Sequence, residues 1–286
     1  MAREQPAVNC YVPKARTEDS YIFLKGYKHI MIHPTALIDP KAELADDVEI
    51  GAYSIIEAKV RIDAGTWIGP HAVITGRTSI GKNNRIFQFT SIGEEPQDMK
   101  YKGEDTELII GDNNTIRELC TFSRGTVQDG GVTRIGNNNW IMACVHIAHD
   151  CTLGDNIIMG NNSALAGHVK IDDHAILSGY ALIHQFCEVG AHSFTSFASH
   201  VNQSIPPYVT VSGEKASVKG INSEGLRRRG FTKEQIQQVR RAYKAIYRES
   251  LSLEDAIAKL EEMAIDSSEI QPMVEFLKSA DRGIIR

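Results

Sequence analysis

Aliphatic residues recur at every sixth position along most of the chain. One series runs from Ile32 to Ile92, and after a gap of eighteen residues a second series runs from Ile110 to Phe122. After a further step of thirteen residues the pattern runs from Ile135 to Val189. A period of six fits neither the 3.6-residue helix nor a simple strand alternation. The fifth position of each unit is mostly small and the second is often Gly or Asp, so the pattern predicts short strands joined by tight corners.

Two interruptions of the six-residue pattern predict loops near 93–109 and 123–134 that leave a repetitive body. The pattern leaves open whether the thirteen-residue step hides one more unit. It ends near Val201, and from Thr232 the apolar spacing becomes helical, with Thr232 as an N-cap. A second helix is expected to start at Ser252, and a short third helix is expected over residues 276–286.

These patterns divide the chain into three parts. The repeats predict a β domain over residues 31–215, and the tail predicts a helical domain over residues 216–286. Residues 1–30 lack the repeat, so we expect them to form an N-terminal extension that is either flexible or non-native.

Composition narrows the classes of protein. The chain has 286 residues, 42 % of them apolar, and a formal net charge of −5, which disfavours a broadly basic nucleic-acid binder. No apolar stretch approaches the roughly 20 residues of a membrane span, and the first 30 residues do not resemble a secretory signal. The five cysteines form no CxxC pair, which favours a reduced, cytoplasmic setting. Three of them, Cys120, Cys151 and Cys187, fall at the small inward position and are interpreted as core residues.

Four histidines gather in the later repeats, at His146, His149, His168 and His184. Imidazoles on one exposed face would form a polar wall of a cleft, although corner positions also tolerate polar residues with no function. An imidazole can take a proton from a hydroxyl near neutral pH, and a carboxylate can fix its tautomer. Asp150 follows His149 directly, but neighbouring side chains usually diverge, so the sequence leaves their contact open.

The repeats resemble those of the hexapeptide-repeat acyltransferases, whose fold is a left-handed parallel β-helix with three units per coil. Six further segments resemble the UDP-N-acetylglucosamine O-acyltransferases of that group, over residues 31–286 and in the same order. They are residues 97–101 (QDMKY), 146–151 (HIAHDC), 165–169 (LAGHV), 184–187 (HQFC), 220–231 (GINSEGLRRRGF) and 282–286 (RGIIR). The resemblance implies a homotrimer that moves a 3-hydroxyacyl group from acyl carrier protein to the 3-hydroxyl of UDP-N-acetylglucosamine. This is the first step of lipid A biosynthesis, and neither a metal nor an organic cofactor is implied.

The resemblance also implies roles for individual residues. His149 would be the general base, Asp150 would support it, and the Gly167 N–H would bind the oxyanion in a direct attack. The remaining implied residues fall into four groups: Gln97, Asp98 and Lys100 on the first loop; His168, Gly179 and His184 along the cleft; Asn222, Glu224 and Arg228 at the nucleotide; and His146, Gln185 and Arg229 near the diphosphate.

The segment 227–248 is strongly basic within an acidic chain. Its only acidic residue is Glu234, set against eight basic ones: Arg227, Arg228, Arg229, Lys233, Arg240, Arg241, Lys244 and Arg248. This patch would suit acidic acyl carrier protein, although a solvated helix face would have the same composition.

One position departs from a familiar version of the family, which has glycine near the end of the acyl groove. Phe197 stands at that position here. A ring at this point predicts a preference for acyl chains of about ten to twelve carbons, unless it points into the core or away from the groove.

Two rival functions remain at this stage. A zinc-dependent hydratase on the same β-helix would use the clustered histidines as metal ligands. A non-catalytic β-helix scaffold would need neither the histidines nor the basic patch.

Overall fold

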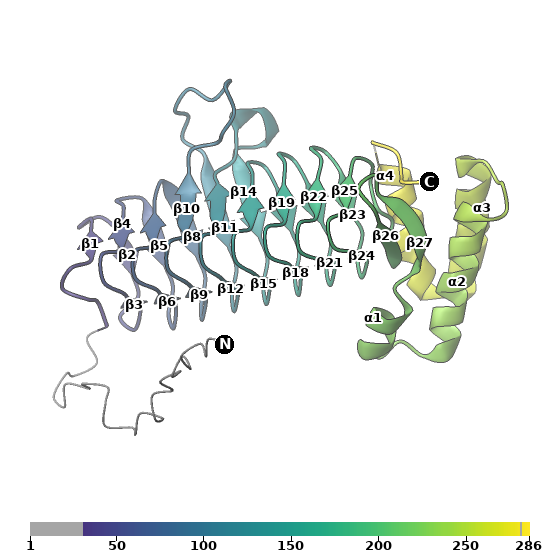
Figure 1. Cartoon of the computed structure of the whole chain (residues 1–286), viewed down its shortest axis with the longest axis horizontal. Helices are drawn as coiled ribbons and strands as arrows, with labels where there is room; N and C mark the ends of the chain where they lie inside the picture. The colour runs from purple at the N-terminus through teal and green to yellow at the C-terminus, as the bar shows by residue number, and fades with distance from the viewer. Residues whose placement is uncertain (1–30, 281) are drawn as a thin grey trace, which may run out of the picture. The chain divides into compact units, whose positions relative to one another are not determined.

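Short parallel strands stack into three sheets and wind as a β-helix, followed by a group of helices (Figure 1). The computed structural model describes residues 31–280 and 282–286, so the expectations for residues 1–30 lie outside the described part. Residues 31–286 form one compact unit. None of the helices in the described part has the length and apolar character that a membrane crossing requires.

Every third strand along the chain belongs to the same sheet. The first sheet contains β1 (Leu37–Ile38), β4 (Ile55–Ile56), β7 (Val73–Ile74), β10 (Ser91–Glu94), β13 (Thr121–Ser123), β16 (His146–Ile147), β19 (Ala164–Leu165), β22 (Leu182–Ile183) and β25 (His200–Val201). The second contains β2 (Glu43–Leu44), β5 (Val60–Ile62), β8 (Arg77–Ile80), β11 (Glu107–Ile110), β14 (Val132–Ile135), β17 (Thr152–Leu153), β20 (Lys170–Ile171) and β23 (Glu188–Val189). The third contains β3 (Glu49–Ile50), β6 (Trp67–Ile68), β9 (Arg85–Ile86), β12 (Thr115–Ile116), β15 (Trp140–Ile141), β18 (Ile158–Met159), β21 (Ile176–Leu177), β24 (Phe194–Thr195), β26 (Val209–Ser212) and the antiparallel β27 (Ser217–Ile221).

The six-residue pattern has the structural cause that was predicted. Residues one coil apart are paired in register, as Ile147 is with Leu165, and Leu165 is with Ile183. These aliphatic side chains point inward and are almost completely buried. Cys151 and Cys187 lie in the same core with no exposed surface, because three converging sheets leave space for only small side chains beside the large ones.

The corners of the β-helix repeat an unusual backbone conformation. Between the first and second sheets, Asp150, His168 and Phe186 have φ angles of 60°, 63° and 63°. Non-glycine residues rarely adopt this left-handed conformation, which here turns the chain sharply from one sheet into the next. The corner therefore presents these three side chains in a column on the outside of the coil.

Both interruptions of the repeat leave the β-helix at this same corner. The first separates β10 from β11, and the second, which includes η2 (Val127–Asp129), separates β13 from β14. Since β13 pairs in the first sheet and β14 in the second, the thirteen-residue step contains no extra unit. The two loops are joined through Arg124, which donates to Gly93 O (2.6 Å) and to the Tyr101 hydroxyl (3.1 Å).

The C-terminal region contains α1 (Ser223–Arg228), α2 (Lys233–Tyr247), α3 (Leu253–Asp266), η3 (Ser268–Ile270) and α4 (Gln271–Ser279). The predicted helix starts are confirmed: Thr232 forms a capping box at α2, and at α3 the Ser252 side chain accepts from Asp255 N as the N-cap. The sequence analysis missed α1 and the β26–β27 hairpin.

The predicted helix over residues 276–286 was wrong in its limits. The last helix, α4, begins at Gln271 with a proline in its first turn, where a missing N–H costs little, and it ends at Ser279. Beyond it, Gly283 has a φ of 67° and Ile284 forms a parallel bridge with Ser204. Ile285 joins the β-helix core, so burial of this apolar pair directs the chain end back onto the coil.

Candidate active site

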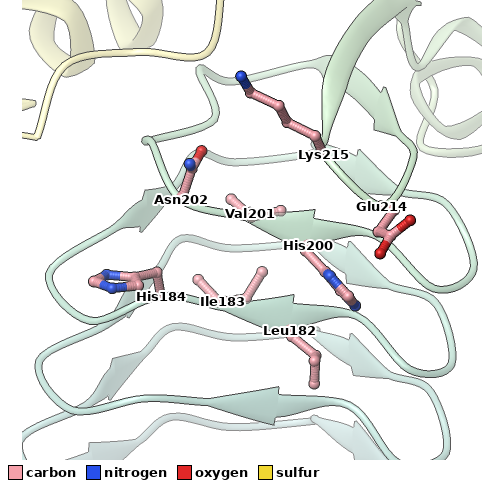
Figure 2. Close-up of a pocket in the computed structure, with 8 residues that line it drawn as sticks. All are labelled: Leu182, Ile183, His184, His200, Val201, Asn202, Glu214 and Lys215. Carbon is pink, nitrogen blue, oxygen red and sulfur yellow. The ribbon is translucent and has the colours of Figure 1, made fainter.

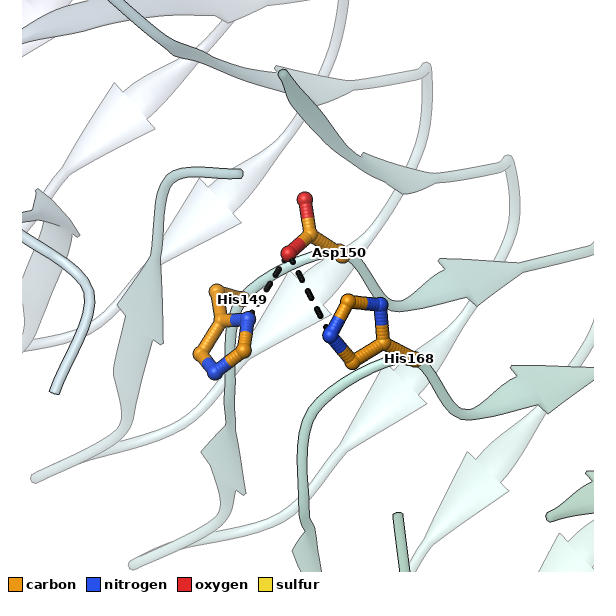
Figure 3. A group of neighbouring side chains, drawn as sticks. All are labelled: His149, Asp150 and His168. Carbon is orange, nitrogen blue, oxygen red and sulfur yellow. Dashed lines mark hydrogen bonds and ion pairs between the residues drawn. The ribbon is translucent and has the colours of Figure 1, made fainter. Parts of the chain in front are cut away.

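His149, Asp150 and His168 meet at the corner between the first and second sheets (Figure 3). His149 Nδ1 lies 2.7 Å from Asp150 Oδ2, so the contact that the sequence left open is present. The Asp150 side chain is fully buried and that of His149 is 15 % exposed. An ionised carboxylate only accepts hydrogen bonds, so Nδ1 carries the proton and Nε2 is left as the basic nitrogen.

The environment of Asp150 keeps its carboxyl ionised. Burial raises its pKa, but hydrogen bonds from His149 and from the side chain and backbone of Thr126 outweigh burial and lower the pKa below its ordinary value. The backbone N–H of Asp150 also donates to the buried Thr133 hydroxyl (2.8 Å). Both the charge and the position of this side chain are therefore fixed.

Gly167 lies directly beneath the His149 ring, one coil further on. A Cβ at this position would lie 2.6 Å from His149 Cε1, so any side chain there would displace the imidazole. Within the described residues the Gly167 N–H has no hydrogen-bond acceptor. The close approach therefore places the Gly167 backbone, with its N–H unpaired in the described residues, beside the basic imidazole.

A pocket of about 560 Å³ opens beside this corner and is lined by Asp98, Lys100, Thr126, Gln128, Asp129, His168, Lys170, Phe186, Glu188 and Arg282. The pocket thus brings the first-loop residues Asp98 and Lys100 together with His168. His168 stacks on the Phe186 ring with centroids 4.4 Å apart, and its Nδ1 lies 2.8 Å from Asp129 Oδ2. Gln97 is exposed on the same loop and does not line the pocket.

His146 and His184 lie on the face of the first sheet. His146 Nδ1 is 2.8 Å from the Thr121 hydroxyl, and burial lowers the pKa of this imidazole, which favours its neutral form. His184 lies 3.4 Å from an Arg282 nitrogen and lines a separate pocket of about 300 Å³ over β22 and β25. Figure 2 shows this pocket, with His184 on one side of the strands and His200 and Glu214 on the other. Gln185 is exposed next to His184.

The residues expected to bind the nucleotide lie at a different corner. Asn222 caps α1 by accepting from Gly225 N (3.0 Å) and donates to His192 O (2.9 Å), at the corner between the second and third sheets. Glu224 is an acceptor for Arg227 and Arg228. A single chain therefore does not bring these residues together with His149.

Arg229 lies near a stacked pair of corner histidines, His174 and His192, to which the sequence analysis assigned no role. The rings of His174 and His192 stack with centroids 4.7 Å apart, and His192 also stacks on Tyr208. Burial, then the charges of His174 and Arg229, lower the pKa of His192 to about 4, and burial lowers the pKa of Arg229. Their eighteen-residue spacing was the sequence signal for this pair.

Phe197 points away from the core. Its exposed fraction is 67 %, and its ring meets that of Tyr180 edge to face, with centroids 5.4 Å apart. A Cβ on Gly179 would lie 3.1 Å from this ring, so Gly179 leaves the space that the ring occupies. Phe197 lies on the corner that leads into β25, whose residues line the smaller pocket.

The sequence analysis missed two residues of the second loop that touch the site, Thr126 and Asp129. Thr126 binds Asp150 and Asp129 binds His168. The only signal for them was the position of the insertion, which leaves the same corner one coil before His149.

Comparisons with known proteins agree with one another. Residues 205–285 match the family model described as domain 2 of UDP-N-acetylglucosamine O-acyltransferase, and residues 133–167 match the bacterial transferase hexapeptide (six repeats). The acyl-[acyl-carrier-protein]–UDP-N-acetylglucosamine O-acyltransferase of Thiobacillus denitrificans is 58 % identical over 255 residues, covering 89 % of this chain and 99 % of the relative. That of Herminiimonas arsenicoxydans is 55 % identical over 260 residues, covering 90 % and 99 %.

Solved structures show the same likeness. The structure titled as LpxA from Acinetobacter baumannii is 49 % identical, has a TM-score of 0.88, and matches 90 % of this chain and all of its own. The Francisella novicida UDP-N-acetylglucosamine acyltransferase is 44 % identical with a TM-score of 0.88, covering 90 % of this chain and 94 % of that one. These likenesses confirm a left-handed parallel β-helix of hexapeptide repeats with C-terminal helices.

Proposed function

The chain belongs to the acyl-[acyl-carrier-protein]–UDP-N-acetylglucosamine O-acyltransferases, enzymes of the first step of lipid A biosynthesis, and we propose that His149 is its general base. The substrate pair is a 3-hydroxyacyl carrier protein and UDP-N-acetylglucosamine, whose 3-hydroxyl is acylated. The observation that carries the proposal is the buried Asp150 carboxylate bound to His149 Nδ1, with Gly167 against the same ring.

The geometry supports a direct transfer. His149 Nε2 takes the proton of the sugar 3-hydroxyl while the hydroxyl oxygen attacks the thioester carbonyl carbon. The carbonyl oxygen becomes an oxyanion, which the Gly167 N–H stabilises. When the intermediate collapses, the carbon–sulfur bond breaks, and the proton held by His149 passes to the thiolate of the carrier protein. Asp150 stabilises the imidazolium that exists between these steps.

We extend the proposal to the substrate contacts. Asp98, Lys100 and His168 line one pocket and suit a polar sugar and its acyl donor. Gln97 would contact the same substrates from the loop, and Gly179 and His184 would line the acyl cleft. His146 and Gln185 would lie near the diphosphate.

A homotrimer explains why the remaining site residues lie at another corner. The corner between the second and third sheets bears His192, which Asn222 contacts, and the segment from Asn222 carries Glu224, Arg228 and Arg229. His149 lies at the corner between the first and second sheets. A neighbouring subunit would complete the site if the corner between its second and third sheets faced His149. We keep the domain limits 31–215 and 216–286 as part of this proposal.

The cytoplasm remains the expected location. Among the described residues Cys120, Cys144, Cys151 and Cys187 are free thiols, which supports a reducing environment.

An acyl-transfer assay tests the proposed function. Purified protein is incubated with UDP-N-acetylglucosamine and a panel of 3-hydroxyacyl carrier proteins of different chain lengths. We expect acylation at the sugar 3-hydroxyl with at least one donor. Failure with every donor, by protein whose melting curve shows it to be folded, would contradict the proposal.

The exposed basic face of α2 is proposed as the docking surface for acyl carrier protein. Arg240, Arg241 and Lys244 are all exposed on this helix. Changing the three to glutamate is expected to raise KM for the carrier substrate about tenfold at low salt, and less at high salt, because exposed charges are screened.

Steady-state kinetics with varied carrier protein measures this effect. The matched control changes three exposed basic residues of the early coils, Lys41, Arg61 and Lys82, to glutamate. Equal KM values for the two triple variants would show that α2 is only a solvated face.

The zinc-dependent hydratase remains a second candidate because ligand atoms of His149, Asp150 and His168 lie within 4.8 Å of one another. Against it, Asp150 already accepts from His149 Nδ1 and from both Thr126 donors. A zinc ion would have to replace bonds that are already satisfied.

Metal analysis distinguishes the two candidates. We expect less than about 0.1 zinc per chain and unchanged acyl transfer after chelation, because each catalytic step is assigned to a side chain or a backbone N–H. Stoichiometric zinc, with activity lost to a chelator and restored by Zn²⁺, would favour metal chemistry.

A further inference from the structure

Thr126 holds both oxygens of the Asp150 carboxylate. It lies in the second loop just after β13 and is almost completely buried. Its backbone N–H donates to Asp150 Oδ1 and its hydroxyl donates to Oδ2, each at 2.6 Å. Two bonds from one residue define the plane of the carboxylate, since rotation about its Cβ–Cγ bond would break both.

The orientation of this plane matters because two imidazoles lie near the same oxygen. Asp150 Oδ2 is 2.7 Å from His149 Nδ1 and 3.8 Å from His168 Nε2, and the two rings meet edge to face. A carboxylate that rotated by a small angle could approach His168 instead. His149 would then lose the acceptor that keeps its proton on Nδ1.

We propose that Thr126 is a positioning residue for the transfer reaction, which fixes Asp150 on His149 and so keeps His149 Nε2 available as the base. The inference rests on the proposed role of His149. Thr126 also lines the pocket assigned to the substrates, but its backbone N–H and its hydroxyl both donate to Asp150, so its polar groups act through that carboxylate.

The electrostatics of Asp150 support this role. The buried carboxyl has a lowered pKa partly because the Thr126 side chain and backbone donate to it. Removing the hydroxyl leaves a buried carboxylate with one donor fewer, so both its orientation and its ionised form become less favourable.

The test is Thr126→Val, which keeps the shape of the side chain and removes the hydroxyl donor. We expect kcat to fall about tenfold or more, as for the loss of a hydrogen bond to a charged group. KM for either substrate should stay within about twofold, because the substrate contacts are unchanged. Thr126→Ser restores the hydroxyl and should recover kcat to within about threefold of the wild type.

Thr66→Val is the matched control. Thr66 is equally buried, and its hydroxyl donates to Gly81 O (2.8 Å) in the early coils. This variant should lose thermal stability to a similar extent and keep its kcat. If Thr126→Val retains kcat within twofold, or if Thr66→Val loses as much kcat, the proposal is overturned.

A second measurement separates this inference from the proposed function. Nitrogen-15 NMR of labelled histidine, in protein without substrates, reports which ring nitrogen carries the proton. His149→Gln identifies the signals of His149. We expect the Nδ1–H form in the wild type and a mixture of tautomers in Thr126→Val. An unchanged tautomer would overturn the role of Thr126, even if acyl transfer proceeds. A wild type that shows no acyl transfer would refute the proposed function and leave the tautomer result valid.

Discussion

Replacing His149 with alanine is expected to lower kcat for acyl transfer by about 10²- to 10⁴-fold, the usual contribution of a general base. The fall follows from the loss of Nε2, the basic nitrogen that Asp150 holds in place through Nδ1. Binding of UDP-N-acetylglucosamine should change little, because the proposed nucleotide contacts lie at another corner. Rapid-quench measurement of single-turnover transfer, with calorimetric titration of the nucleotide sugar, gives the two values separately.

His71→Ala is the control for this experiment. His71 is an exposed histidine at a corner of the early coils, stacked between Tyr53 and Phe89. His71→Ala also removes an imidazole from a corner, so it should lower the stability of the protein but leave the rate of acyl transfer unchanged. If His149→Ala retains more than half of the wild-type rate, another group is the base.

Replacing Phe197 with glycine is expected to shift the preferred acyl chain from about ten to twelve carbons toward fourteen or more. Phe197 precedes β25, which lies three strands beyond β16 in the first sheet, or about 14 Å at 4.8 Å per coil. An extended chain advances about 1.3 Å per carbon, so a ring at this height stops a chain of about eleven carbons. Each excluded methylene forfeits about 0.8 kcal/mol of burial. Four methylenes therefore account for a change in selectivity of up to about 200-fold.

Competition between 3-hydroxyacyl carrier proteins of ten and fourteen carbons measures this selectivity directly. Because the ring is exposed, its removal leaves no cavity in the core, and the melting temperature should stay almost unchanged. Phe89→Gly, another exposed aromatic on a corner of the early coils, should leave the selectivity unchanged. A wild type that already prefers fourteen carbons would show that Phe197 does not limit the chain.

The repeat could be predicted from the sequence because each inward position accepts only a narrow range of side chains. Residues such as Ile147 and Leu165 are paired one coil apart, so the sequence period equals the length of a side of the coil. The helix starts at Thr232 and Ser252 could also be predicted, because each cap depends only on residues a few positions away in the sequence. The end of the chain was less predictable because Ile284 and Ile285 are placed by contacts with a distant part of the coil.

The site was only partly predictable for a similar reason. The histidines and Asp150 are visible in the sequence, but the contact between His149 and Asp150 depends on the left-handed backbone of Asp150. The role inferred for Thr126 depends on how the second loop folds back over the corner, which spacing alone does not determine. The sequence also does not show that His149 and the expected nucleotide-binding residues lie at different corners. This becomes clear only when each strand is assigned to a sheet.

Both loops leave the β-helix at one corner, and the strands that flank them stay paired with the neighbouring coils, apart from one register shift between Ile92 and Glu94 where the first loop begins. The length of an insertion at this corner is therefore uncoupled from the geometry of the core. Loop closure becomes only slowly more costly with length, so this edge can lengthen or shorten at little expense in folding free energy. In evolutionary terms, the geometry of the coil can stay the same while the loops change. The corner that bears His149 is where substrate preference can diversify while the coil and its base remain in place.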